Sequence, residues 1–119
     1  HQIGARWDVP HGVTSCIVLP AVMRVLAPRT LPAQRRIAEA LGVRTEGHEA
    51  ATVAAEAADR LEAFIATLGV PTRLSQVGAV REEIGAVAHA VFEELSKLAR
   101  GSAPELHERE LADLLDSVW

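Results

Sequence analysis

Apolar residues recur every three or four positions over two long stretches of this chain. Between 47 and 68 the charged residues fall largely between the apolar positions, and the same spacing returns between 81 and 98. The apolar positions of the first stretch are Ala50, Val53, Ala54, Ala57, Leu61, Phe64, Ile65 and Leu68. This period is that of an α-helix with one buried face, and no alternating strand pattern accompanies it. The sequence therefore predicts an all-α fold.

Prolines and glycines predict where two further helices begin and end. Residues 11–27 are apolar nearly all round, and Pro20 lies in their middle. Because a central strand excludes proline, we predict a buried helix that is kinked at Pro20 and ended by Pro28. A proline-opened helix is predicted over 31–42, with Gly42 just after its end.

The remaining segments are predicted to be one helix and its connections. Residues 1–9 have no clear period and are predicted to form a loop. Residues 69–80 are predicted to be a connector with one turn at 74–77. A break is expected at 101–104, and a last helix is expected over 107–118.

Composition narrows the class of protein. The chain has 119 residues, of which 49% are hydrophobic and only 3% aromatic, so its modest core must be aliphatic. The net charge of −4 argues against a nucleic-acid or anionic-membrane surface. The cluster of Arg29, Arg35 and Arg36 is followed by Glu39, which favours a solvated helix face. Cys16 is the only cysteine, which fits a reducing, cytoplasmic compartment, and no run of 18 apolar residues predicts a membrane span.

The segment Asp8-Val9-Pro10-His11-Gly12 is the strongest candidate for a functional site. Pro10 suits the first turn of a helix, which places His11 in that turn and leaves open space beside the ring at Gly12. His1 lies ten residues upstream. Histidine serves as a metal ligand and as a proton carrier, but spacing alone fits a surface or capping histidine better.

No other part of the chain carries a complete catalytic pattern. His48, His89 and His107 are predicted to be structural or solvated. The adjacent pairs Glu82-Glu83 and Glu93-Glu94 point in different directions on a helix, so neither is expected to form a two-carboxylate site. A phosphate loop, a paired-cysteine zinc pattern and a serine elbow are all missing from the sequence.

The N-terminal motifs resemble those of a known family. His1-Gln2-Ile3-Gly4-Ala5, then Asp8 to Gly12, then Leu19-Pro20, resemble the C-terminal helical domain of the iron-containing (group III) alcohol dehydrogenase and maleylacetate reductase superfamily. The ending Leu111–Trp119 is similar to the final helix of that family. The resemblance implies a dehydroquinate synthase-like fold, in which a dinucleotide-binding domain precedes a bundle-like helical domain. Residues 1–119 are then expected to be a single helical domain, a fragment that lacks the dinucleotide-binding domain and part of the helical domain.

The resemblance also implies a function. The parent would be a cytoplasmic, NAD(P)-dependent, metal-assisted alcohol dehydrogenase that transfers hydride between an alcohol or aldehyde and nicotinamide, with a homodimer as one option. His11 matches a histidine of the family's Fe²⁺ or Zn²⁺ ligand set. His1 matches the histidine near nicotinamide and substrate, which is assigned to proton relay. Because the other ligands lie upstream in the family, the fragment alone is expected to be inactive.

Two alternatives remain open at this stage. A maleylacetate reductase-like enzyme would reduce a carbon–carbon double bond, and a non-catalytic helical interaction domain would have no chemistry. Maleylacetate reductases usually have His-Ala and a further histidine where this chain has the segment His11 to Ser15, so Gly12 favours the alcohol dehydrogenase branch. Many family members carry Asn-Pro-Arg where this chain has Ser102-Ala103-Pro104-Glu105, which leaves the substrate class open.

Overall fold

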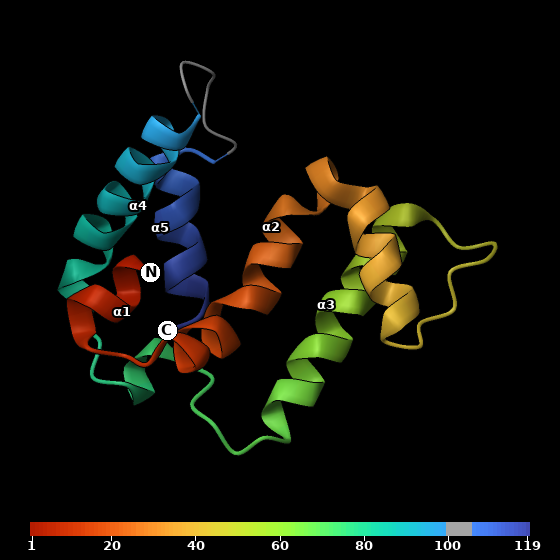
Figure 1. Cartoon of the computed structure of the whole chain (residues 1–119), viewed down its shortest axis with the longest axis horizontal. Coiled ribbons are helices and arrows are strands. Elements are labelled where there is room, and N and C mark those ends of the chain that lie inside the picture. The colour runs from red at the N-terminus through yellow and green to blue at the C-terminus, as the bar shows by residue number, and fades with distance from the viewer. Residues whose placement is uncertain (100–105) are drawn as a thin grey trace. The chain divides into compact units, whose positions relative to one another are not determined.

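The computed structural model describes residues 1–99 and 106–119, and it assigns helices, turns and no strand to them (Figure 1). The α-helices are α1 (Gln2–Trp7), α2 (His11–Ala40), α3 (Ala50–Ala66), α4 (Ile84–Leu98) and α5 (Glu108–Ser117), and the 3₁₀ turns are η1 (Leu74–Gln76) and η2 (Arg81–Glu83). The predicted all-α fold is confirmed. The predicted break at 101–104 lies outside the described residues.

These elements form two compact units. The first unit comprises His1–Ile17 and Pro71–Trp119, and the second comprises Val18–Val70. The chain passes from the first unit into the second within α2.

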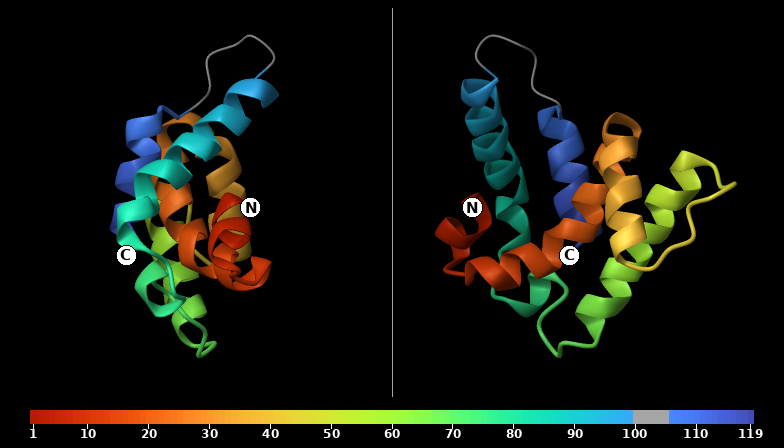
Figure 2. Two further views of the ribbon diagram at one scale, coloured as in Figure 1. Left: turned by 90° about the vertical axis from the view of Figure 1, so that its left-hand side faces the viewer. Right: turned by 45° about the vertical axis from the view of Figure 1, so that its right-hand side comes forward.

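The first unit is built on the pair α4 and α5. The two helices pack against each other, and α1 packs against α4 (Figure 2). The buried apolar residues that these elements supply are Ile3, Ile84, Val87, Ala88, Leu111, Leu114 and Leu115. The η1 turn contacts the C-terminal end of the chain. The backbone N–H of the fully buried Leu74 donates a hydrogen bond to the carbonyl of Val118 at 2.9 Å. Aliphatic side chains therefore form this core, as the composition predicted.

The loop predicted for residues 1–9 is wrong, because α1 occupies most of it. A helix of six residues is unstable in isolation, and its sequence shows no recognisable period. Contacts made with distant residues stabilise it: Ile3 is buried, and Arg6 and Trp7 both hydrogen bond to Glu83. Tertiary packing therefore decides the structure of this segment.

The second unit contains the main break in α2. Thr30 has non-helical dihedral angles (φ −130°, ψ 20°), which agrees with the helix end predicted at Pro28 and the new helix predicted from residue 31. The additional kink predicted at Pro20 is wrong, because Pro20 lies in a helical part. Gln34 spans the break, and its amide donates to the carbonyl of Met23 at 2.6 Å and to the hydroxyl of Thr30 at 3.0 Å. Prolines on both sides, Pro28 and Pro32, remove backbone donors there, which accounts for a break at this place.

A small core joins α2 to α3 within the second unit. Its buried members are Met23, Ala38, Val43, Val53, Ala57 and Ala58. Gly42 ends α2 with a positive φ of 77°, as predicted, and Gly69 follows α3 with a φ of 68°. The helix predicted from Gly47 starts only at Ala50, after a turn. The ends of α2 and α3 could thus be predicted from the glycines that follow them. The start of α3 could be predicted only to within about three residues.

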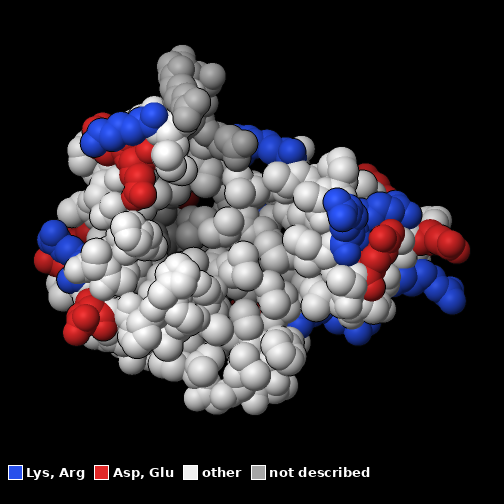
Figure 3. All heavy atoms as spheres, in the orientation of Figure 1, with Lys and Arg blue, Asp and Glu red and all other residues white. Residues whose placement is uncertain are grey.

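Charged side chains of both signs are interspersed on the face shown in Figure 3. The Nε atom of Arg35 lies 3.5 Å from Oε1 of Glu39, one helical turn further along the chain. The guanidinium of Arg35 also donates a hydrogen bond to the backbone carbonyl of Thr45. These contacts agree with the prediction of a solvated helix face for the arginine cluster.

By length and composition, α2 is the one helix of the described residues that could cross a membrane, although it contains no unbroken run of 18 apolar residues. Within the second unit, Met23 and Ala38 of α2 belong to the core with α3. Arg24 of α2 pairs with Asp59 and Glu62 of α3. These contacts use part of the apolar surface of α2, of which 22% of the most apolar 18-residue window is buried.

Candidate functional site

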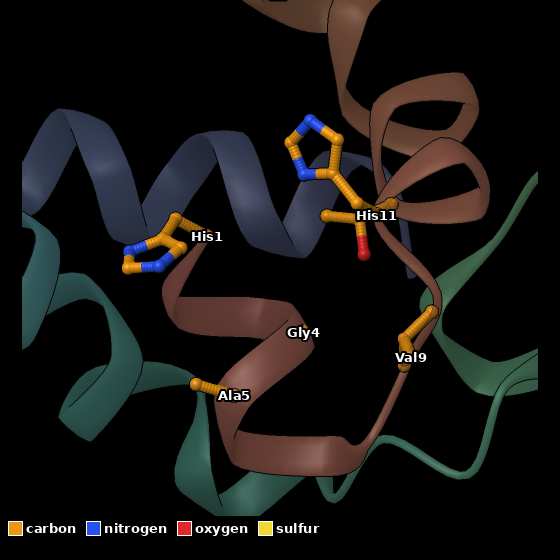
Figure 4. Close-up of a pocket in the computed structure, with 6 residues that line it drawn as sticks. His1, Gly4, Ala5, Val9 and His11 are labelled. Carbon is orange, nitrogen blue, oxygen red and sulfur yellow. The ribbon is translucent and has the colours of Figure 1, made fainter.

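A pocket of about 320 Å³ lies at the N-terminal ends of α1 and α2, open on one side (Figure 4). Its lining residues are His1, Gly4, Ala5, Val9, His11 and Thr14, all from the first unit. Both histidines predicted from the motifs are among them. The structure thus brings His1 and His11 to one pocket, although each begins a different helix.

A tight reversal of the chain between α1 and α2 creates this arrangement. Asp8 ends α1 in the left-handed region, with a φ of 53°, a conformation that aspartate tolerates better than most residues. Val9 is buried, and α2 starts at His11 directly after Pro10, as predicted. A Cβ atom on Gly4 would lie only 3.0 Å from the carbonyl oxygen of Val9, so glycine permits the close approach of α1 to this segment.

His11 faces open space. It is the first residue of α2 and is exposed, and a Cβ atom on the adjacent Gly12 would meet no atom within 4 Å. The backbone carbonyl of His11 accepts a hydrogen bond from the Ser15 hydroxyl at 2.9 Å. The imidazole is therefore accessible to a ligand, as the sequence predicted from Gly12.

His1 lies beside a carboxylate of α4. Its Nδ1 atom is 3.8 Å from Oε1 of Glu94, and its side chain is 82% exposed. The other carboxylate oxygen of Glu94 accepts a hydrogen bond from the side-chain amide of Gln2 at 2.8 Å. One carboxylate thus faces both residues at the start of α1.

The C-terminal end of α1 is fixed by Glu83. Arg6 donates two hydrogen bonds to the two oxygens of Glu83, at 3.0 and 2.9 Å, and the indole N–H of Trp7 donates a third at 2.8 Å. The hydrogen bonds from Arg6 and Trp7 hold the pKa of the Glu83 carboxyl below its usual value. Hydrogen bonding to Glu83 likewise raises the pKa of Arg6. Short as it is, α1 is therefore anchored at both ends.

Comparison with known proteins identifies the family. The sequence model of the Fe-containing alcohol dehydrogenase family, C-terminal, matches residues 1–119. The chain belongs to this family. The resemblance found in the first 20 residues is therefore confirmed over the whole chain.

Curated relatives of this Fe-containing alcohol dehydrogenase domain are bacterial oxidoreductases. Lactaldehyde reductase of Escherichia coli (strain K12) is 32% identical over 119 residues, which cover all of this chain and 31% of the relative. 1,3-Propanediol dehydrogenase of Citrobacter freundii is 31% identical over 114 residues, which cover 91% of this chain and 29% of the relative. The probable NADH-dependent butanol dehydrogenase 2 of Bacillus subtilis (strain 168) is 25% identical over 116 residues, which cover 97% of this chain and 30% of the relative. The chain thus spans about a third of the length of these relatives.

The described residues hold few side chains that could bind a metal together. No group of three or more His, Cys, Asp or Glu side chains suited to a metal occurs within residues 1–99 and 106–119. The exposed imidazole of His11, next to open space, fits the role of one ligand. A four-coordinate site needs further donors beyond His11 and His1.

The other predicted features of the alcohol dehydrogenase domain lie away from the pocket or outside the described residues. His48, His89 and His107 are exposed and do not line the pocket. His107 caps α5, where its backbone N–H donates to Glu110, and His89 pairs with Glu108. The segment 102–105, where the sequence departs from Asn-Pro-Arg, lies outside the described residues.

Glu83 and Glu94, which hold α1 beside the pocket, were not predicted to do so. In the sequence they were noted only as members of the adjacent pairs Glu82-Glu83 and Glu93-Glu94. They stand eleven positions apart, which is about three turns of an α-helix and places both on one face. That spacing was the available signal, but its meaning depends on α1 packing against this face.

Proposed function

We propose that residues 1–119 form one helical domain of a longer NAD(P)-dependent, metal-assisted alcohol dehydrogenase, which transfers a hydride between an alcohol or aldehyde and nicotinamide. The observation that carries the proposal is the pocket shared by His1 and His11 in a chain of the Fe-containing alcohol dehydrogenase family. The names of the relatives, which act on lactaldehyde, 1,3-propanediol or butanol, support this chemistry.

The two histidines are proposed to have different roles. His11 would hold Fe²⁺ or Zn²⁺ together with donors from the rest of the enzyme. The bound metal supplies Lewis-acid polarisation of the substrate oxygen. His1 would accept the hydroxyl proton of the alcohol at an imidazole nitrogen and release it to solvent, while hydride goes to nicotinamide.

The rest of the enzyme is proposed to supply what this chain lacks. The coverage of about 31% of the length of lactaldehyde reductase supports a larger polypeptide with a dinucleotide-binding domain. The chain alone would then be inactive, and a cytoplasmic location and a homodimer are proposed by analogy with the family. Oxidation of simple alcohols, compared with reduction of maleylacetate by the same enzyme, tests the proposal against the rival reduction of a carbon–carbon double bond.

Substitution of each histidine in the full-length enzyme tests the roles. His11→Ala is expected to lose bound metal and activity together, because it removes a ligand. His1→Ala is expected to keep its metal and to slow turnover by roughly 10²–10⁴-fold, the usual contribution of proton transfer. Metal content is measured by elemental analysis and turnover by the absorbance of the reduced nicotinamide.

His48→Ala is the matched control, since His48 is exposed and does not line the pocket. Loss of metal in His1→Ala with retention in His11→Ala would reverse the assignment. Retention of metal and full activity in both variants would contradict the proposed site.

A further inference from the structure

The N-terminal end of α1, where His1 lies, is held by one residue of α4. Arg6 and Trp7 hold the far end of α1 on Glu83, and near the other end Gln2 hydrogen bonds to Glu94, beside the buried Ile3. Glu94 is partly buried, with 44% of its side chain exposed. A carboxylate in this position controls how the first residues of α1 are oriented.

The two oxygens of Glu94 have separate partners. Oε2 accepts the amide N–H of Gln2 at 2.8 Å, which fixes the plane of the carboxylate. The other oxygen of Glu94, Oε1, faces His1 and lies 3.8 Å from its Nδ1 atom. That distance is longer than a hydrogen bond, so the contact is electrostatic here, and rotation of the exposed imidazole can close it.

We propose that Glu94 is a positioning residue for His1, which holds the imidazole in the orientation and tautomer that carry the proton. This inference rests on the proposed function, in which His1 is the proton relay. The two proposals remain separable, because His1 can be essential whether or not Glu94 acts on it.

The chemistry follows from the two nitrogens of an imidazole. When Nδ1–H donates to a carboxylate, Nε2 carries the lone pair and can accept a proton. In the proposed alcohol oxidation the O–H bond of the substrate would break and an Nε2–H bond would form, and a bound nicotinamide would supply the hydride acceptor. The carboxylate of Glu94 would stabilise the imidazolium until Nε2 passes its proton to solvent, as a carboxylate beside a catalytic histidine does in other enzymes.

Among the described residues, Glu94 is the charged group that faces the imidazole of His1. Glu94 faces the imidazole from α4, and His11 lies across the pocket on α2. On α1 itself, Arg6 is paired with Glu83. Glu94 is therefore the carboxylate that the structure places against this ring.

The test uses the full-length enzyme and a matched pair of variants. Glu94→Gln removes the charge but keeps an amide that can still hydrogen bond with Gln2. Glu93→Gln removes the same charge one position away, at an exposed residue. Both are made in the wild type and in His1→Asn, and kcat/KM for alcohol oxidation is measured from pH 5 to 10, with metal content and thermal unfolding as checks on folding.

Glu94→Gln is expected to lower kcat/KM several-fold and to move the acid limb of its pH profile down by about half a pH unit, the shift expected for an exposed ion pair. Glu93→Gln should leave both unchanged. In His1→Asn, adding Glu94→Gln should change nothing further, because the residue acts through His1.

An acid limb that does not move in Glu94→Gln, or that moves equally in Glu93→Gln, would overturn the inference. So would an undiminished effect of Glu94→Gln in the His1→Asn background. If His1→Asn alone kept full activity, or if the wild type oxidised no alcohol, the proposed function would fail and the inference with it. A slow His1→Asn enzyme beside an unaffected Glu94→Gln enzyme would reject the inference alone.

Discussion

Two glycines in helices occupy opposite environments. Gly4 of α1 lies where a Cβ atom would approach the carbonyl oxygen of Val9 to 3.0 Å, and that oxygen belongs to the backbone. Gly85, near the start of α4, would place a Cβ atom in open space. The same substitution therefore tests whether close packing or helix propensity dominates at each position.

Gly4→Ala is expected to lower the free energy of unfolding by about 1 kcal/mol, because the strain of overpacking exceeds the gain in helix propensity. Gly85→Ala is expected to raise it by about 0.5 kcal/mol through propensity alone. Urea denaturation of both variants beside the wild type measures the two values. Equal stabilisation in both variants would show that α1 does not pack tightly on Val9.

The site residues differ in how far they could be predicted. His1 and His11 stand in a motif, so sequence alone singled them out. Glu83 and Glu94 carry no local signal, because their partners Arg6 and Gln2 lie more than 70 positions away in the chain. Such residues become visible only once the packing of α1 on α4 is known.

At the scale of elements, His89 connects α4 to α5. Its Nδ1 atom lies 3.0 Å from Oε2 of Glu108, although 19 positions separate them. The hydrogen bond to Glu108 and its negative charge, with a smaller contribution from Glu93, raise the pKa of His89. The pair therefore favours the folded state when the imidazole is protonated.

Because the pKa of His89 is higher in the folded than in the unfolded chain, this stabilisation is fully present below about pH 6.5, the ordinary value of histidine. It is lost as the pH rises through the folded pKa. His89→Gln is therefore expected to lower the melting temperature at pH 6 and to have little effect at pH 9. Thermal unfolding followed by circular dichroism measures both, with His48→Gln as the control for removing an exposed imidazole.

If His89→Gln lowered the melting temperature equally at pH 6 and pH 9, the role of the ion pair would be rejected. An equal, pH-dependent loss in His48→Gln would point to a general effect of histidine charge.

The predictability of the helices depended on their length. The long amphipathic α3 and α4 were predicted from the spacing of their apolar residues, and the ends at Gly42 and Gly69 from the residues that follow a helix. The short α1 was missed, since contacts with Glu83 and Glu94 decide it. The break in α2 at Thr30 agrees with the helix end predicted at Pro28, whereas the kink predicted at Pro20 is wrong.

At the scale of the whole molecule, the proposed site draws on one pocket of this chain. His1 and His11 share a pocket, and the described residues contain no cluster of three or more side chains that could hold a metal. The chain covers about 31% of the length of lactaldehyde reductase.

The chain on its own is therefore expected to bind Fe²⁺ or Zn²⁺ weakly. Two imidazoles leave at least half of a four-coordinate site without protein donors, and a structural or catalytic zinc site needs at least three. Calorimetric titration of residues 1–119 with Zn²⁺ at pH 7.5 should show no stoichiometric site with a dissociation constant below about 1 μM. The full-length enzyme, titrated under the same conditions, should show one, and His11→Ala should abolish it. A sub-micromolar, stoichiometric site in the chain alone that disappears in His11→Ala would mean that residues 1–119 provide additional ligands.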